Sequence, residues 1–373
     1  MKVLITGANG FIGKNLCATL DRDERYELLK VDHETTAAEL EEYLKECEFI
    51  FHLAGVNRPK DEKEFLEGNA DFTEQITHSL QNVNRRNGRK VPIVFTSSIQ
   101  ADRDNPYGQS KKQGEWALVD YGKTTGAPVH IYRFTNIYGK WSRPNYNTVV
   151  ATFCNNIARG LSIQVNNPEA DLVLCYIDDV VEEFLKVLQG RPTIENGRCM
   201  VPVTHTIKLG ALADTFRGFK ESRGNLSVAN MSNQLEKNLY STYLSFLQED
   251  DFSYPLRMNV DDRGSFTEIL RSPDRGQVSV NISKPGITKG NHWHHSKTEK
   301  FLVVSGTGVI RFRKIGENQV IDYHVSGDKL EVVDIPTGYT HNIENLGETD
   351  MVTIMWVNEC FNPEKPDTYY EEV

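Results

Sequence analysis

The first apolar run of the chain, residues 3–6, leads directly into three evenly spaced glycines, Gly7, Gly10 and Gly13. A buried strand, a glycine-rich turn and a helical stretch in this order are typical of a βαβ dinucleotide-binding unit. The glycines permit a tight turn and close approach of a pyrophosphate, whose charge then faces the amides at the helix N-terminus. The sequence therefore predicts a dinucleotide site here, the alternative being a purely structural turn.

Up to about residue 243, short apolar runs alternate with longer amphipathic stretches. Runs without polar alternation suit strands that are covered on both faces, with helices between them. The runs are residues 3–6, 28–32, 49–54, 93–97 and 130–134. This pattern predicts an α/β, Rossmann-type fold with a doubly wound parallel sheet.

The pattern changes after Tyr243, where strand candidates follow one another closely and turn sequences separate them. They are residues 278–282, 301–304, 309–312, 330–335 and 352–357. Such spacing indicates an all-β barrel or sandwich. We therefore expect two domains, a nucleotide-binding domain over residues 1–246 and an all-β domain over residues 252–373.

The chain carries 52 acidic and 42 basic residues, a net charge of −10. This charge argues against a general nucleic-acid-binding or anionic-membrane surface, although local amides can still bind small anions. No apolar run reaches membrane-spanning length, and the first one is too short for a signal peptide. The six cysteines show no paired spacing, so we expect reduced thiols in a cytoplasmic protein without membrane insertion.

Tyr107 and Lys111 are four residues apart and share one face of an expected helix. A lysine ammonium near a phenol lowers the phenol's pKa, so that it can exchange a proton near neutral pH. Ser97 and Ser98 end the preceding apolar run, and a serine hydroxyl there can hydrogen-bond a substrate oxygen. After a dinucleotide motif, this combination predicts a proton-transfer site rather than an ordinary surface pair.

These residues resemble the extended short-chain dehydrogenase/reductase family over roughly residues 1–240. Further matching segments are residues 51–55, Asn69, residues 133–139 and residues 176–180. The resemblance implies that Tyr107 is the general acid, that Lys111 orients the ribose and tunes Tyr107, and that Ser98 polarises the carbonyl. Ser97 is the second choice for polarising the carbonyl, because two adjacent serines leave open which of them faces the substrate.

The same resemblance implies the ligand contacts of this domain. The cofactor would contact Gly7, Gly10, Phe11, Ile12, Gly13, Asp32, Leu53, Ala54 and Lys111. A sugar nucleotide would contact Arg133, Asn136 and Asn145, with ordinary loop packing as the alternative for these residues. Dehydratases of the family carry an Asp-Glu pair where this chain has Ile99 and Gln100, which disfavours dehydration and leaves ketone reduction or 4-epimerisation.

The choice of cofactor is open at this point. Asp32 is placed to accept hydrogen bonds from a ribose 2′-hydroxyl, which favours NAD. A 2′-phosphate there would meet like charge, and the compensating cations in the sequence, Lys14 and His33, are weak candidates.

A second glycine-framed motif, from Gly286 to Gly306, contains His292, His294 and Glu299. The two histidines are two residues apart, so on a strand their side chains share a face. His341 would complete a three-histidine, one-glutamate set, which suits Zn, Mn, Fe or Ni. A single histidine in this region would more often be a structural residue than a metal ligand, but the joint spacing of the four residues predicts a metal site.

These spacings resemble the two motifs of the cupin family, except that Leu330 stands at the first glycine of the second motif. A further segment, residues 262–268, resembles one in dTDP-4-dehydrorhamnose 3,5-epimerases, cupin-fold enzymes that usually work without a metal. By that resemblance His292 would be the catalytic base, whereas the complete metal motif favours a ligand. If His292 is a ligand, the base is unassigned, and the candidates are Tyr323, His324 and Tyr339.

A sugar epimerase deprotonates a carbon next to a ketone, and a reductase consumes the same ketone. Epimerisation at C3 must therefore precede reduction at C4, because the ketone acidifies the C3 hydrogen and a metal or hydrogen-bond donor can stabilise the enolate. The combination resembles a family of bacterial capsular polysaccharide enzymes on the route to UDP-N-acetyl-L-fucosamine. The resemblance implies a homodimer that uses Zn²⁺ and NADPH. It also implies that a UDP-2-acetamido-2,6-dideoxy-4-hexulose is epimerised in the cupin domain and reduced to UDP-N-acetyl-6-deoxy-L-talosamine in the first domain.

Two alternatives remain. The chain can be a single-activity nucleotide-sugar reductase or 4-epimerase whose cupin domain only stabilises a dimer around a structural metal. It can also be a non-enzymatic sensor that couples nucleotide binding to a ligand-binding cupin. The intact set of Ser98, Tyr107 and Lys111 argues against the sensor, because a sensor can lose catalytic residues without penalty.

Overall fold

The computed structural model describes the backbone of residues 1–373 and the side chains of all but residues 86 and 87. It divides into two compact units. The first comprises residues 1–217 and 232–248, and the second comprises residues 218–231 and 249–373. Residues 218–231 are thus grouped with the second unit, although the sequence pattern places them before the change to closely spaced strands.

The first unit alternates strands and helices along the chain. Its elements are β1 (Lys2–Thr6), α1 (Phe11–Leu20), β2 (Glu27–Val31), α2 (Ala37–Glu46), β3 (Phe49–His52), α3 (Lys63–Phe65), η1 (Leu66–Asp71), α4 (Phe72–Asn87), β4 (Ile93–Ser98), η2 (Ile99–Asp102), α5 (Pro106–Thr125), β5 (Val129–Phe134), β6 (Asn136–Tyr138), α6 (Val149–Ala158), β7 (Asp171–Tyr176), α7 (Ile177–Leu188), β8 (Ile194–Glu195), β9 (Arg198–Cys199), β10 (His205–Lys208), α8 (Leu209–Asn225) and α9 (Gln234–Leu244). Helix α8 continues into the second unit.

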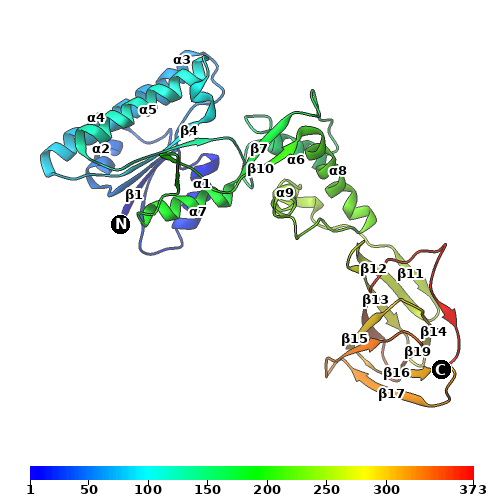
Figure 1. Ribbon diagram of the computed structural model, residues 1–373. Coiled ribbons are helices and arrows are strands. Elements are labelled where there is room, and N and C mark those ends of the chain that lie inside the picture. Colours follow the sequence, from blue (N-terminus) through cyan, green and yellow to red (C-terminus); the bar gives the residue numbers. More distant parts are fainter. The chain divides into compact units, whose positions relative to one another are not determined.

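A seven-stranded sheet in the order β2-β1-β3-β4-β5-β9-β8 forms the centre of this unit (Figure 1). Neighbouring strands are parallel from β2 to β9, and β8 runs antiparallel to β9. The strand order reverses between β1 and β3. In doubly wound sheets such a reversal places the ligand crevice at the carboxyl ends of these two strands. The predicted parallel α/β fold is confirmed.

Helices cover both faces of the sheet. On one face, Leu16 of α1 and Phe184 of α7 belong to one buried cluster with strand residues. On the other face, Leu40 of α2, Leu80 of α4 and Leu118 of α5 belong to a second cluster. Because both faces are covered, the strands carry unbroken apolar runs rather than alternating ones.

A smaller sheet of the first unit has the order β10-β7-β6, with β6 parallel and β10 antiparallel to β7. It presents Asn136 at the start of β6. Among the helices that the structure describes, none combines the length and the apolar character needed to cross a lipid bilayer.

The second unit is all-β apart from the end of α8 and a short 3₁₀ helix. Its further elements are η3 (Glu249–Asp251), β11 (Met258–Asp261), β12 (Gly264–Ser272), β13 (Gly276–Ser283), β14 (Thr288–Trp293), β15 (Glu299–Ser305), β16 (Thr307–Lys314), β17 (Val320–Ser326), β18 (Val332–Ile335), β19 (Tyr339–Asn345), β20 (Met351–Val357) and β21 (Tyr369–Tyr370). Each predicted apolar run of this region falls within or overlaps one of these strands.

Two antiparallel sheets make up this unit, β11-β12-β13-β20-β15-β18 and β17-β16-β19-β14-β21. Their inner faces contribute a common core that includes Phe301, Ile310, Phe312, Ile343 and Met351. Antiparallel sheets packed in this way form the jelly roll of the cupin class, so the predicted fold of the second domain is also confirmed.

The turn between β12 and β13 depends on a glycine. Gly276 has φ +75°, and a Cβ at this position would lie 1.8 Å from the Val357 carbonyl oxygen of β20. Gly316, in the turn between β16 and β17, also has a positive φ, +85°, but a Cβ there would meet no described heavy atom within 4 Å. Alanine substitutions at these two glycines therefore separate the energetic cost of a left-handed backbone conformation from the cost of a steric clash.

We expect Gly276→Ala to destabilise the second unit by about 3 kcal/mol, because about 1 kcal/mol of backbone strain adds to about 2 kcal/mol of overpacking. Gly316→Ala should cost only about 1 kcal/mol, the backbone term alone. Calorimetric unfolding of the full-length variants measures both. Equal costs for the two substitutions would show that the turn before β13 can move away from β20.

Candidate functional site

The turn after β1 is packed too tightly for side chains. A Cβ at Gly7, which has φ +68°, would lie 2.8 Å from the Ala54 amide nitrogen at the end of β3. A Cβ at Gly13 would lie 2.1 Å from the Gly7 carbonyl oxygen. Gly10 is the N-cap of α1 and supplies no side-chain cap, so the first amides of the helix can bind an anion. The structure thus brings the predicted glycines together with Leu53 and Ala54 at the strand-order reversal.

Asp32 follows β2 and is fixed beside the same turn. Its carboxylate accepts hydrogen bonds from the Asn9 side chain and, at 2.9 Å, from the Glu34 amide. Lys14 and Lys30 line, with Asn9, a hollow of about 340 Å³. Sequence reasoning had not considered Lys30. Lys30 donates to Asp21 Oδ2 at 2.8 Å, so Lys14 is the cation that suits a phosphate, beside a carboxylate that suits a ribose hydroxyl.

Tyr107 lies near the start of α5, where burial raises the pKa of its phenol. A hydrogen bond with Ser98, the last residue of β4, opposes this rise, and the nearby Tyr146 adds to it. The sequence predicted a pKa lowered by Lys111. In this structure desolvation of the phenol outweighs the opposing effects, so the phenol remains protonated at neutral pH, the form that a proton donor needs.

Lys111, one turn further along α5, is buried beneath the end of β4. Its Nζ donates to the Thr96 carbonyl oxygen at 3.1 Å, and burial lowers its pKa to about 8. A Cβ at Gly55 would lie 2.8 Å from this nitrogen, so the ammonium faces the backbone just beyond β3. Lys111 and Tyr107 therefore lie at the carboxyl ends of β3 and β4.

The two serines of β4 have different partners. Ser97 is buried and donates to Glu115 Oε1 at 2.5 Å, whereas Ser98 forms the hydrogen bond with Tyr107. Arg133 donates from Nε and Nη2 to Glu115, at 2.8 and 2.6 Å, and from Nη1 to Asp102 at 2.7 Å. The geometry favours Ser98 as the residue beside Tyr107. It gives no support to Arg133 as a substrate ligand, because its guanidinium is occupied by two carboxylates.

The remaining candidates for a sugar nucleotide are Asn136, which begins β6, and Asn145, which lies on a loop. Asn136 donates to the Val173 carbonyl oxygen at 3.2 Å, so its amide is engaged within the small sheet. Asn145 has φ +55°, and its carbonyl oxygen lies 3.5 Å from Nη1 of Arg58. Sequence reasoning missed two residues of this region. Arg58 lies beside Asn145, and the ring centroid of Phe65 is 5.6 Å from that of Tyr107. Their position shortly after the third apolar run is the signal that could have found them.

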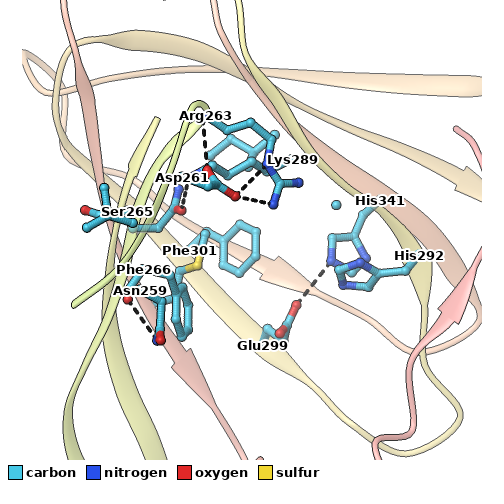
Figure 2. Close-up of a pocket in the computed structure, with 15 residues that line it drawn as sticks. Asn259, Asp261, Arg263, Ser265, Phe266, Lys289, His292, Glu299, Phe301 and His341 are labelled. Atoms are coloured by element: carbon cyan, nitrogen blue, oxygen red, sulfur yellow. Dashed lines mark hydrogen bonds and ion pairs between the residues drawn. The ribbon is translucent and has the colours of Figure 1, made fainter. Parts of the chain in front are cut away.

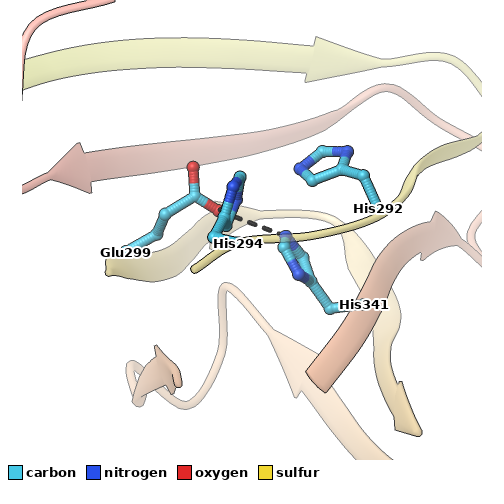
Figure 3. A group of neighbouring side chains, drawn as sticks. All are labelled: His292, His294, Glu299 and His341. Atoms are coloured by element: carbon cyan, nitrogen blue, oxygen red, sulfur yellow. Dashed lines mark ion pairs between the residues drawn. The ribbon is translucent and has the colours of Figure 1, made fainter. Parts of the chain in front are cut away.

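In the second unit, His292, His294, Glu299 and His341 converge on one point (Figure 3). Each offers a ligand atom, and all four atoms lie within 4.8 Å of one another. His292 and His341 face each other across the pairing of β14 with β19, and Glu299 begins β15. The structure therefore brings together every predicted metal ligand.

The protonation states of this cluster suit a cation. Burial opposes ionisation of Glu299, but the neighbouring imidazoles of His294 and His341 lower the pKa of its carboxyl to about 2. The Oε2 atom of Glu299 lies 3.6 Å from Nε2 of His294 and 3.1 Å from Nε2 of His341. Burial lowers the pKa of His292 to about 4. At neutral pH the carboxylate is thus charged and His292 is neutral, which are the forms that bind metal.

A residue from the end of the chain orients one of these imidazoles. Nδ1 of His294 lies 2.6 Å from the Asp367 carbonyl oxygen, so Nδ1 carries the proton and Nε2 offers its lone pair. Among the described side chains, the buried His294 Nε2, His341 Nε2 and Glu299 Oε2 have no hydrogen-bond partner. Three such atoms aimed at one point fit a divalent metal ion.

The metal-type cluster opens into a cavity of about 490 Å³ between the sheets (Figure 2). In this view Lys289 and the Arg263–Asp261 pair lie at the top, and Glu299 lies at the bottom. Tyr323, His324 and Tyr339, the expected candidates for a base, are not among the described residues that line it. Those three are therefore not supported as acid or base groups.

Comparisons with known proteins agree with this two-part architecture. Residues 3–201 match the NAD dependent epimerase/dehydratase family, and residues 259–369 match the polysaccharide biosynthesis C-terminal domain. A UDP-2-acetamido-2,6-beta-L-arabino-hexul-4-ose reductase from Pseudomonas aeruginosa is 47% identical over 99% of this chain and 98% of its own length.

Solved structures are similar over both units. The capsular polysaccharide assembling protein CapF from Staphylococcus aureus is 57% identical, with a TM-score of 0.94 and complete coverage of both chains. A structure of CapF with the inhibitor 3-isopropenyl-tropolone is 53% identical, with a TM-score of 0.90 and the same coverage.

The tight packing at Gly13 yields a test of the nucleotide site. We expect Gly13→Ala to weaken binding of NADPH and NADH at least about tenfold, because the new methyl group displaces the Gly7 carbonyl and distorts the turn. Gly218→Ala is the control, since a Cβ there would meet no described heavy atom within 4 Å. Fluorescence titration gives both affinities and the preferred cofactor. Unchanged affinity of Gly13→Ala would exclude this turn as the site.

Proposed function

This chain belongs to the NAD dependent epimerase/dehydratase family, and over its full length to the CapF type of capsular polysaccharide proteins; from this premise we propose that it is a bifunctional nucleotide-sugar enzyme. The substrate is a UDP-2-acetamido-2,6-dideoxy-4-hexulose. The cupin domain, residues 252–373, epimerises C3. The reductase domain, residues 1–246, then reduces the C4 ketone in a route to UDP-N-acetyl-L-fucosamine for capsule formation. The observation that carries this proposal is the presence in one chain of a proton-donor site at a dinucleotide crevice and a metal-type cavity.

In the reductase domain, the glycine turn after β1 would hold the nicotinamide cofactor, which would supply the hydride for reduction at C4. Tyr107 is the general acid, because burial keeps its phenol protonated and Ser98 holds the hydroxyl. Lys111 anchors the ribose from beneath the strand ends, and Ser98 also polarises the ketone. We propose NADPH as the preferred cofactor, with Lys14 offsetting the charge of Asp32, and NADH as the alternative. The product is UDP-N-acetyl-6-deoxy-L-talosamine, and the working form is a homodimer.

In the cupin domain, His292, His294, Glu299 and His341 hold a zinc ion. A bound divalent metal supplies positive charge that polarises a carbonyl oxygen and lowers the pKa of the adjacent C–H. Tropolones carry two adjacent oxygens that chelate metals, so the tropolone inhibitor of the CapF relative is compatible with a metal in that protein. The Asp367 carbonyl keeps the His294 ring in the orientation that ligation needs.

The order of the two reactions follows from the ketone. The C4 carbonyl makes the C3 hydrogen acidic, and its reduction removes that activation. Epimerisation must therefore come first, and the cupin reaction needs no nicotinamide. This independence separates the proposal from the alternative of a reductase with a purely structural cupin.

The decisive experiment uses the full-length Tyr107→Phe variant with the 4-keto substrate in D2O, without added cofactor. We expect deuterium at C3 at close to the wild-type rate, because the cupin site is unchanged. With NADPH added, oxidation of the cofactor should fall at least about 100-fold, the contribution of a general acid. NMR follows exchange, and absorbance follows NADPH.

Wild-type protein that oxidises NADPH but incorporates no deuterium would leave only the single-activity reductase. Protein that does neither with any 4-keto sugar nucleotide would favour the nucleotide-binding sensor. Loss of both activities in Tyr107→Phe would show that the two sites are not independent.

The role of His292, ligand or base, can be separated by metal content. We expect His292→Ala to lower metal affinity by about 10-fold or more, because it removes one of four ligands. His295→Ala is the control, since His295 is exposed and packs against Trp293 and Tyr369. Elemental analysis after dialysis against a weak chelator measures retained zinc. Full retention by His292→Ala together with lost exchange would assign His292 as the base.

A further inference from the structure

The cavity beside the metal-type cluster has six ionisable side chains among its described lining residues: Asp261, Arg263, Lys289, His292, Glu299 and His341. Epimerisation at C3 requires one of them, or a group that they position, to accept a proton. The last three are assigned to the metal, which leaves three groups at the other end of the cavity (Figure 2).

Two of these three are poor proton acceptors. Arg263 donates from Nε and Nη2 to Asp261 Oδ2, at 3.0 and 2.6 Å. Its guanidinium does not lose a proton in proteins. The same hydrogen bonds lower the pKa of the Asp261 carboxyl, which makes this carboxylate a weaker base than an isolated one. The pair is therefore suited to charge balance rather than to proton removal.

Two oxygen acceptors hold the side-chain nitrogen of Lys289. Its Nζ donates to Asn281 Oδ1 and to the Ile282 carbonyl oxygen, both at 2.8 Å. A neutral amine has two N–H bonds and one lone pair, and these two acceptors match the two N–H bonds. In the neutral form the lone pair of Nζ is then not used by either acceptor, and Lys289 lines the cavity.

The surroundings of Lys289 lower the pKa of its amine, which makes the neutral form more accessible than in an exposed lysine. Burial lowers the pKa of the Lys289 amine, Asp261 partly opposes this, and Arg263 adds to it. The metal ligands His292, Glu299 and His341 line the same cavity, and Asn281 and Ile282 contribute no ionisable side chain. A lysine desolvated in this way is a recognised kind of general base.

We propose that Lys289 is the base that removes the C3 proton in the cupin reaction, an inference that rests on the proposed epimerase function. The C3–H bond breaks, and an N–H bond forms on Lys289. The electron pair of the C–H bond becomes the C3–C4 π bond, while the carbonyl π electrons move to the C4 oxygen. Water then protonates C3 on the opposite face, the ketone reforms, and the Lys289 proton neutralises the hydroxide. One proton leaves and one returns, with no net redox change.

Exchange at C3 in D2O tests this assignment in the full-length Tyr107→Phe background. We expect Lys289→Ala to slow exchange about 100-fold or more, the usual contribution of a general base. Lys289→Arg should be equally slow, because it keeps the positive charge but cannot accept a proton. Lys284→Ala is the matched control, since Lys284 is exposed and does not line the cavity. Zinc content and thermal unfolding of each variant establish that the site is intact.

Added primary alkylamines provide the second measurement. They should restore exchange to Lys289→Ala, and the restored rate should rise with the basicity of the amine. If Lys289→Arg keeps the parent rate, Lys289 acts by charge and the proposal is wrong. Failure of every amine to restore exchange would also overturn it. If the Tyr107→Phe parent shows no exchange, the epimerase function itself fails, so the two failures are distinguishable.

Discussion

Burial of ionisable side chains is the constraint on which both sites of this chain depend. Lys111 lies beneath the end of β4, with the Thr96 carbonyl oxygen as its hydrogen-bond acceptor. Glu299 lies beside the imidazoles of His294 and His341, which lower the pKa of its carboxyl despite desolvation. A buried charge is costly unless partners surround it, so the neighbouring strands must supply those partners in place. The end of β4, which presents the Thr96 carbonyl, and the pairing of β14 with β19 are the features that do so.

The parts of this architecture that follow from local pattern were predictable from the sequence. Apolar runs without alternation identified the strands of the parallel sheet, since covering of both faces leaves no polar side of a strand. The spacing of the two motifs predicted His292, His294, Glu299 and His341 as one ligand set, and the structure brings all four together, with His294 just beyond the end of β14. These expectations succeed because each depends on the geometry of one strand, turn or helix.

The parts that failed or stayed open depend on contacts between distant segments. Which of the two serines lies beside Tyr107 depends on Glu115, because this carboxylate accepts a hydrogen bond from the Ser97 hydroxyl and pairs with Arg133. The carbonyl of Asp367, 73 residues beyond His294 in the chain, sets the orientation of that ring. The pKa of Tyr107 was expected to fall beside Lys111, but burial raises it. The extent of burial is a property of the packed unit, so sequence spacing alone could not reveal its effect.

The same physical cause produces opposite chemical roles in the two units. Desolvation disfavours whichever form of a group is charged. For the phenol of Tyr107 the charged form is the deprotonated one, so burial preserves the proton donor that ketone reduction needs. For the amine of Lys289 the charged form is the protonated one, so burial lowers its pKa and favours the proton acceptor that the proposed epimerisation needs. Desolvation therefore favours a proton donor in one unit and a proton acceptor in the other, as the proposed pair of reactions on one substrate requires.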